Sequence, residues 1–554
     1  MRLSRPLLVA VAALGALALP GTATAADGGD NEFVVVYNEA ADLSAARQAV
    51  ADAGGEIVSE NAAIGVATVR SSRHDFKQRV DAQSALVGAA ANGAIGHAPP
   101  AERPKRDDVE NLGTARAGGK KPKPQRGVEP LSGLQWDMKM IDATPEGSYA
   151  QEQGSHDVKV GIMDTGIDGS HPDLRPNLDR RLSRNFTTDI PLIDGPCADD
   201  PDGSCEDPAD VDENGHGSHV AGTIGSPLNG QGIGGVAPRV SLANLRAGQD
   251  SGFFFLQPTV DALTYAGDNG IDVVNMSFFI DPWLFNCASN PADSPEEQAE
   301  QRTIVTATQR AIDYARAHGV TTIAAEGNGN SDLGKPMVDT TSPDFPPGSE
   351  RQRTIDNTCL SMPTEANGVI GVTSVGKSGR KAYYSDYGLE QADVSAPGGD
   401  RRDFFGTPQY NLPDTRILAP YPEGVGRVED SDGDGVPNID ANGNVTTSLV
   451  VKDHGAYYQW IQGTSMASPH AVGVAALAVA HFGTRDRDHG GLTLDPAETE
   501  RHLLDGARDT PCPTPPVLDY PDLGPEFTAT CEGDADRNGF YGDGIVNAVG
   551  VLRP

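Results

Sequence analysis

Long apolar runs and positive charge are what this 554-residue sequence has least of. Beyond its first twenty or so residues, no stretch approaches the roughly 18 apolar residues expected of a membrane-spanning helix. Lysine and arginine total 43 against 78 aspartates and glutamates, which gives a formal net charge of −35. Because nucleic acids and most membrane surfaces are also anionic, we expect no nucleic-acid partner and no membrane association of the mature protein.

Cysteine is also scarce, and no CxxC pair occurs, which disfavours a zinc site. The six cysteines are an even number, as expected in an oxidising compartment. Six cysteines allow about fifteen pairings. The pairing that closes the short loops first joins Cys197 to Cys205 and Cys512 to Cys531, and leaves Cys287 for Cys359.

The N-terminus has the pattern of a secretory signal peptide. Arg2 and Arg5 precede an apolar run over 7–19, and small residues around Ala25 fit a cleavage site. We therefore predict a signal peptide over 1–25 and a secreted, extracellular protein.

A small folding unit and a linker are predicted to follow. Strand patterns over 33–37, 56–58 and 65–69 alternate with helical patterns over 43–53 and 74–87. This order predicts a ferredoxin-like α+β domain over 26–98. Residues 99–130 are rich in proline, glycine, lysine and arginine without periodicity, which is typical of a linker and a plausible processing region.

The remainder, residues 131–554, alternates between buried strands and helices. Strands are predicted over 158–163, 271–276, 320–325 and 369–375, and helices over 260–268 and 303–318. Such apolar strands predict an α/β fold with a mostly parallel sheet covered by helices on both faces. In these sheets functional groups gather at the carboxyl ends of the strands.

Three short motifs supply an acid, a base and a hydroxyl nucleophile. Asp164 follows the first strand, His216 stands between glycines, and Ser465 opens a long apolar helix over 466–481. Together these are the parts of a Ser-His-Asp catalytic triad. Each motif also has an alternative interpretation: Asp164 as a turn residue, His216 and His219 as metal ligands, and Ser465 as a helix cap.

Other hydrolase classes fit less well. An aspartic protease needs a second Asp-Thr-Gly run, and none is found. An esterase of the α/β-hydrolase type needs a Gly-x-Ser-x-Gly elbow and the order Ser, Asp, His, whereas here the order is Asp, His, Ser. A catalytically inactive binding protein on the same fold stays open as the alternative.

The motifs Asp164-Thr-Gly-Ile-Asp, His216-Gly-Ser-His and Gly463-Thr-Ser-Met-Ala-Ser-Pro, in this order, resemble the subtilisin-like serine proteases, or subtilases. The resemblance implies a subtilisin-like three-layer fold and a serine endopeptidase that forms an acyl-enzyme with protein or peptide substrates. It implies that the small N-terminal domain is a propeptide that inhibits the enzyme, so that the protein is made as an autoinhibited precursor. It places Asn328 in the oxyanion hole and implies no cofactor for catalysis. We expect a monomer.

Two positions depart from the family pattern. Where the family has Ser-Leu-Gly, this chain has Ser277-Phe-Phe-Ile, and we expect Phe279 to crowd the substrate cleft. Glu326, close to Asn328, replaces a small residue, and we expect it to favour basic substrate side chains.

An acidic insertion at about 400–455 contains a candidate calcium loop. Asp430, Asp432 and Asp434 stand at alternate positions with Gly435 sixth, the spacing of an EF-hand loop, although Ala441 stands where a glutamate is expected. We predict structural calcium here, with a solvated acidic loop as the alternative. Asp173 and Asn229 also match calcium-binding positions of some subtilases.

Overall fold

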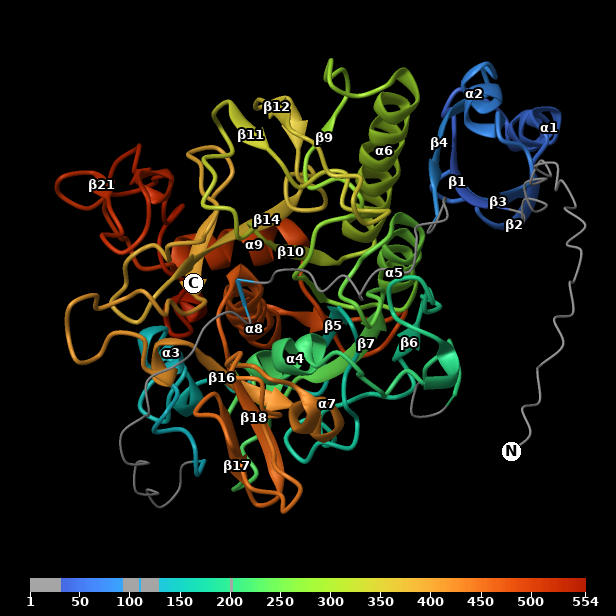
Figure 1. Cartoon of the computed structure of the whole chain (residues 1–554). Helices are drawn as coiled ribbons and strands as arrows, with labels where there is room; N and C mark the ends of the chain where they lie inside the picture. Colours follow the sequence, from blue (N-terminus) through green and yellow to red (C-terminus); the bar gives the residue numbers. More distant parts are fainter. Residues whose placement is uncertain (1–30, 93–108, 111–128, 200–202) are drawn as a thin grey trace, which may run out of the picture.

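The computed structural model describes residues 31–92, 109–110, 129–199 and 203–554. The predicted signal peptide and all but a few residues of the predicted linker lie outside these ranges. Two folded parts result, a small N-terminal domain over 31–92 and a large domain from 129 onward (Figure 1).

The small domain is a four-stranded antiparallel sheet with two helices. Its elements are β1 (Asn31–Tyr37), α1 (Leu43–Ala53), β2 (Glu56–Asn61), β3 (Val66–Ser71), α2 (Phe76–Asp81) and β4 (Leu86–Ala91), in the sheet order β2-β3-β1-β4. The prediction of one helix over 74–87 was wrong at its end. Helix α2 stops at Asp81, and the alanine-rich run over 86–91 is a strand because it pairs with β1 at the sheet edge.

The large domain is built on a seven-stranded parallel sheet. Its strands are β5 (Lys159–Met163), β6 (Arg184–Asn185), β7 (Ser241–Arg246), β8 (Val273–Met276), β10 (Thr321–Ala325), β14 (Val369–Val375) and β15 (Val394–Pro397). The order across the sheet is β15-β14-β10-β8-β5-β7-β6. The four strands predicted from the sequence all form, and all lie in this sheet.

Helices cover both faces of the parallel sheet, as predicted. Helices α4 (His216–Gly225), α8 (Thr464–Phe482) and α9 (Pro496–Gly506) pack on one face, and α5 (Leu256–Asp268) and α6 (Pro295–Ala317) on the other (Figure 1). In the described part of the chain, α8 is the one helix long and apolar enough to span a membrane, but most of it is buried within the protein. It is a core helix, and it forms where the sequence predicted a long apolar helix over 466–481.

Helix α6 begins eight residues before the predicted start. Ser294 caps it by accepting from the Glu297 N–H at 3.2 Å, and the Glu297 carboxylate accepts from the Ser294 N–H at 2.7 Å. This capping box satisfies N–H groups that would otherwise lack partners. The extended helix provides the surface on which the small domain rests.

The remaining elements are short and lie mostly at the rim. They are α3 (Trp136–Met140), β9 (Asn286–Cys287), β11 (Met337–Asp339), β12 (Arg353–Ile355), β13 (Cys359–Leu360), β16 (Ile417–Tyr421), α7 (Glu423–Val428), β17 (Val450–Asp453), β18 (Ala456–Ile461), β19 (Thr484–Arg485), β20 (Leu492–Thr493), β21 (Val517–Leu518) and β22 (Ala529–Thr530). All six cysteines are paired as predicted, in the disulfides Cys197–Cys205, Cys287–Cys359 and Cys512–Cys531.

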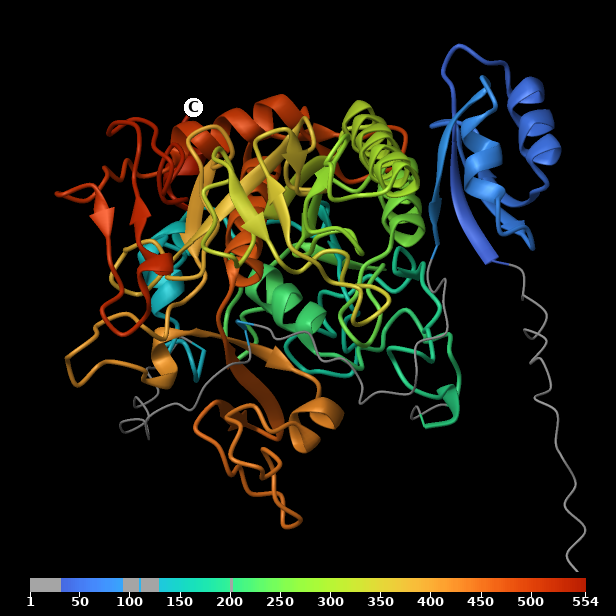
Figure 2. The same ribbon diagram turned by 45° about the horizontal axis from the view of Figure 1, so that its top comes forward.

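The small domain docks through its sheet against α6 (Figure 2). Glu300 of α6 accepts from the backbone N–H of Ala91 at 2.8 Å and pairs with Lys77 at 3.3 Å. Arg310 of α6 donates to the carbonyl of Tyr37 at 2.8 Å. Apolar residues of β1 and β4 join the same buried cluster as α5 and α6, so the two domains share one core.

Candidate active site

Asp164 and His216 meet at the carboxyl end of the sheet. Asp164 follows β5 directly, and His216 is the first residue of α4. Their side chains are hydrogen-bonded, with His216 Nδ1 2.7 Å from Asp164 Oδ1. Gly217 permits this approach, because a Cβ there would collide with the carbonyl oxygen of Gly166. Burial raises the pKa of Asp164, and the neighbouring His216 opposes that rise.

Ser465 lies in the first turn of α8, in the same cleft. It is 5% exposed, and its hydroxyl donates to the carbonyl oxygen of Ser277, just after β8, at 3.4 Å. The start of α8 directs free N–H groups and the positive end of the helix dipole at this position. The cleft that contains Ser465 also contains His216.

Asn328 is held with its amide nitrogen directed into the cleft. Its Oδ1 accepts from the N–H and from the hydroxyl of Thr464, each at 2.9 Å. These two bonds fix the amide, so Nδ2 is the donor left for a group in the cleft. This contact of Thr464 joins residues 136 positions apart, so it could not be inferred from the sequence.

Glu110 occupies the centre of the cleft, which the sequence gave no reason to expect. Its Oε2 lies 3.2 Å from His216 Nε2, and its Oε1 accepts from Asn328 Nδ2 at 3.4 Å. The carbonyl of the preceding Val109 accepts from Gln462 at 3.1 Å. Glu110 is 6% exposed, so this segment of the predicted linker is buried among the three motifs.

The electrostatics of His216 reflect both acids. Burial lowers its pKa, but the attraction and hydrogen bonds of Asp164 and Glu110 outweigh burial and raise the pKa well above its usual value. His219, in contrast, is fully buried, and its Nε2 lies 3.2 and 3.1 Å from the carbonyl oxygens of Ile417 and Gln459. Burial lowers the pKa of His219 to about 3. Its contacts are therefore those of a neutral core residue.

Aromatic side chains form a wall of the cleft. Phe278 stacks on Phe254 with ring centroids 4.1 Å apart and planes 2° from parallel. Phe279 and Leu284 line the same cavity. The structure thus places Phe279 at the cleft, as predicted, and adds the stacked pair beside it.

Glu326 also lines this cavity, but its carboxylate is buried. The residue is 1% exposed and follows β10 directly. Burial raises its pKa well above the usual value, and the nearby acids Glu365, Asp393 and Asp386 raise it further.

The predicted calcium loop gathers its three acids. Ligand oxygens of Asp430, Asp432 and Asp434 all lie within 4.8 Å of one another. The Asp430 carboxylate accepts from the N–H groups of Asp434 and Gly435 at 3.0 and 2.7 Å. The preceding residue, Glu429, lines the catalytic cavity, so the loop adjoins the cleft.

A second candidate region for calcium joins Asp173 to Asn229, whose Nδ2 donates to Asp173 Oδ1 at 3.1 Å. The structure adds Glu129, which sequence reasoning missed. Burial raises the pKa of Glu129 to about 7 and that of Asp173 to about 6.

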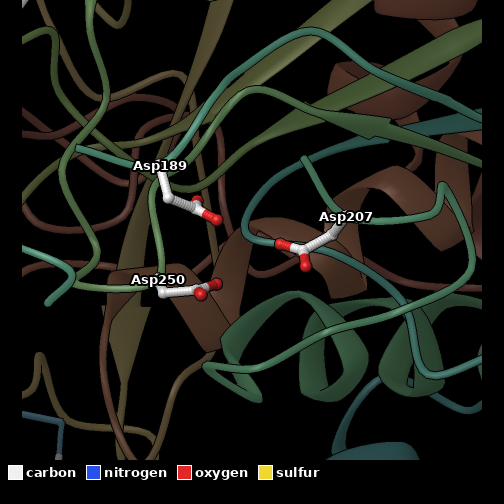
Figure 3. Close-up of side chains that lie close together, drawn as sticks. All are labelled: Asp189, Asp207 and Asp250. Atoms are coloured by element: carbon white, nitrogen blue, oxygen red, sulfur yellow. The ribbon is translucent and has the colours of Figure 1, made fainter. Parts of the chain in front are cut away.

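A third acidic group already holds a cation of its own. Asp189, Asp207 and Asp250 turn their carboxylates toward one another (Figure 3). Arg246, at the end of β7, is fully buried; it pairs with Asp189 and Asp250 at 2.9 Å each and also with Asp207. The guanidinium group of Arg246 provides a positive charge at this cluster.

The parallel α/β fold and this cleft define a class, the serine hydrolases that carry an acid, a histidine and a serine at the carboxyl ends of a sheet and the start of a helix. Comparisons with known proteins narrow the class. The sequence profile of the subtilase family matches residues 155–544. The chain belongs to the subtilase family and is a serine protease acting on proteins or peptides.

Individual relatives agree with this assignment. Subtilisin DY of Bacillus licheniformis is 29% identical over 335 residues, 60% of this chain and 81% of its own. The major intracellular serine protease of Bacillus subtilis is 30% identical over 290 residues, 52% of this chain and 72% of its own. A structure of the epidermin leader peptide processing serine protease of Staphylococcus aureus superposes with a TM-score of 0.60 at 18% identity, covering 94% of this chain and 98% of its own. At that identity the structural likeness bears on the fold alone.

Proposed function

We propose that this protein is a secreted serine endopeptidase in which Ser465 is the nucleophile, His216 the general base and Asp164 the residue that orients His216. The observation that carries the proposal is the short bond between Asp164 and His216 in the cleft that also holds Ser465. The signal-type N-terminus and three disulfides support secretion.

The proposed reaction is acyl transfer. The Ser465 hydroxyl oxygen attacks the carbonyl carbon of the scissile peptide while His216 Nε2 takes the hydroxyl proton. His216 then gives that proton to the leaving amine nitrogen as the peptide C–N bond breaks. Water, deprotonated by the same nitrogen, attacks the acyl-enzyme and releases the carboxylic acid and free Ser465.

Asn328 is proposed to stabilise the oxyanion. Thr464 holds its Oδ1, and Nδ2, which donates to Glu110 in the precursor, would donate to the negative oxygen of the tetrahedral intermediate once Glu110 has left. A preorganised donor of this kind contributes about 3–4 kcal/mol to transition-state stabilisation. The Ser465 N–H, at the start of α8, is the second proposed donor.

The precursor is proposed to be inhibited twice. The small domain is docked on α6, and the carboxylate of Glu110 lies between His216 Nε2 and Asn328 Nδ2. The carboxylate thereby engages His216 Nε2, which the nucleophile needs as its base, and Asn328 Nδ2, which the scissile carbonyl needs as a hydrogen-bond donor. In that state the Ser465 hydroxyl donates to Ser277. Cleavage within 99–130 would release both contacts.

Catalysis is proposed to need no cofactor, since the proton transfers and the oxyanion donors are all supplied by side chains and backbone. Calcium is proposed as a structural ion at the loop containing Asp430, Asp432 and Asp434, where carboxylate oxygens converge. The protein is proposed to act as a monomer.

The test is to express the wild type and Ser465→Ala as secreted precursors and to follow their size and their hydrolysis of casein. We expect the wild type to shorten by the mass of the N-terminal domain and to digest casein, and the variant to do neither. If a folded wild-type protein stays long and leaves casein intact, the proposal fails and a binding protein on this fold becomes the better interpretation.

A further inference from the structure

Glu326 is one of the residues that line the catalytic cavity, and both oxygens of its carboxylate are buried beneath the cavity surface. It follows β10 and stands two residues before Asn328. Ala325, Ser361 and Thr364 line the cavity with it, and the Thr364 hydroxyl donates to the Ala325 carbonyl at 2.8 Å. Beside Glu326 the cavity is therefore lined by small neutral side chains.

The carboxylate of Glu326 is buried, and it has no hydrogen-bond partner among the described residues. Neither oxygen accepts a hydrogen bond from any described residue, although the residue is 1% exposed. It takes the space above Gly371 of β14, where a Cβ would collide with Oε2. Burying an unpaired polar group costs free energy, and burying an unpaired charge costs more.

In the described part of the chain, the charged groups that act on Glu326 are acids. Its titratable neighbours Glu365, Asp386 and Asp393 are acids, and burial raises the pKa of both Glu365 and Asp386 to about 7.

Two basic residues lie near the neighbouring acids Asp393 and Asp386. Arg537 pairs with Asp393 at 3.0 Å. Lys381, whose pKa burial lowers to about 7, donates to Asn330 at 2.7 Å.

We propose that Glu326 determines the substrate specificity of this protease by receiving the cationic side chain of a lysine or arginine on the acyl side of the scissile bond. The inference rests on the proposed function and names its substrate class. A bound ammonium or guanidinium group would give the carboxylate its missing hydrogen bonds and charge partner. The aromatic wall of Phe278 and Phe279 suits the apolar stem of such a side chain.

The chain itself carries matching substrate sequence. Its linker contains Lys105-Arg106 and Lys120-Lys121, as well as Arg116, in a protein whose net charge is −35. A protease that selects basic residues could cleave this linker and so release its own inhibitory domain.

The experiment compares peptide amides that differ at one residue, arginine or citrulline, which have the same shape but differ in charge. Matured wild-type enzyme is expected to show kcat/KM roughly 10- to 100-fold higher for arginine, the range that a charged hydrogen bond supplies. In Glu326→Gln the ratio is expected to fall to near 1. Glu390→Gln, an exposed acid, serves as the control and is expected to keep the wild-type ratio.

The pH dependence gives a second readout. Because the pKa of Glu326 is raised, its carboxylate ionises only as pH rises, so the arginine-to-citrulline ratio of the wild type is expected to increase with pH. The ratio of Glu326→Gln is expected to stay flat.

The outcomes separate the two proposals. Wild-type enzyme that cleaves citrulline and arginine peptides equally well at every pH overturns the role of Glu326 and leaves the protease intact, without need of any variant. Folded enzyme that cleaves neither these peptides nor casein overturns the proposed function instead.

Discussion

Two buried groups of acids in this protein differ in how their charge is balanced. Asp189, Asp207 and Asp250 surround Arg246, which reaches all three. Glu326 lies among other acids and has no hydrogen-bond partner among the described residues. The first group has a cation from within the chain, although three carboxylates share one guanidinium group and burial raises the pKa of Asp250 to about 8. The second lines the catalytic cavity, where a substrate can supply the cation.

The difference shows what buried charge is used for. A paired cluster holds distant segments together, here the residues around Asp189, those around Asp207 and the end of β7, although it contributes less net stability than its contacts suggest. An unpaired acid costs stability, and such a cost is tolerated at functional sites. Removing the cation from the first group and the acid from the second should therefore have opposite effects on stability.

The largest effect is expected from Arg246→Met. It leaves the buried Asp189 and Asp207 and the partly buried Asp250 without their cation, and it is expected to lower the free energy of unfolding by about 3–5 kcal/mol. Urea unfolding of the Ser465→Ala background, which avoids self-digestion, measures this. Arg180→Met, which removes the exposed pair with Asp210, is the control and should change stability by less than about 1 kcal/mol. Equal losses of stability in both variants would show that the buried cluster contributes no more than an exposed ion pair.

The next largest effect is expected on the rate of maturation, from a change at Glu110, whose carboxylate pairs with His216. Glu110→Gln is expected to speed maturation of the precursor roughly tenfold or more, because a charged hydrogen bond in the cleft is lost. Glu56→Gln, an exposed change in the small domain, is the control. An unchanged maturation rate would mean that docking on α6 alone inhibits the precursor.

The same contact predicts a pH dependence. The pKa of His216 is raised in the precursor from its ordinary 6.5, so the ion pair with Glu110 is fully formed below pH 6.5 and is lost as pH rises through the raised value. Wild-type maturation is expected to accelerate with rising pH, and more steeply than that of Glu110→Gln. Gel assays over a pH series measure both slopes.

A smaller effect of opposite sign is expected from Glu326→Gln. The raised pKa means that the folded state keeps a proton which the unfolded chain loses above its ordinary 4.5, so wild-type stability falls as pH rises through the folded value. The variant lacks this loss and should be more stable by about 1–3 kcal/mol near neutral pH, with no gain below pH 4.5. Unfolding at both pH values tests it; a destabilised variant at neutral pH would indicate an unseen partner.

The smallest effect is expected at the exposed loop of Asp430, Asp432 and Asp434. Removing calcium with a chelator is expected to lower stability by about 1–2 kcal/mol, which returns when calcium is added. In Asp432→Asn the response to the chelator should shrink. A response that Asp432→Asn leaves unchanged would assign the calcium effect to the region of Asp173 and Glu129.

The sequence predicted the parts of the site that depend on local pattern. Asp164 and Ser465 follow or open apolar segments, so their places at a strand end and a helix start could be inferred, and the short cysteine loops indicated their own pairing. Strand β4 was missed because its alanine-rich sequence favours a helix in isolation, and only pairing with β1 decides otherwise.

The sequence by itself determined the alternation of strands and helices, the order of the three motifs and the family. The tertiary structure alone decided where charges find partners: Glu110 on His216, Arg246 among three aspartates, and Glu326 without a cation. The physical reason is the distance along the chain over which each interaction acts. Hydrophobic periodicity is set by neighbouring residues, whereas the balance of a buried charge depends on groups brought within a few ångströms from segments far apart in the chain.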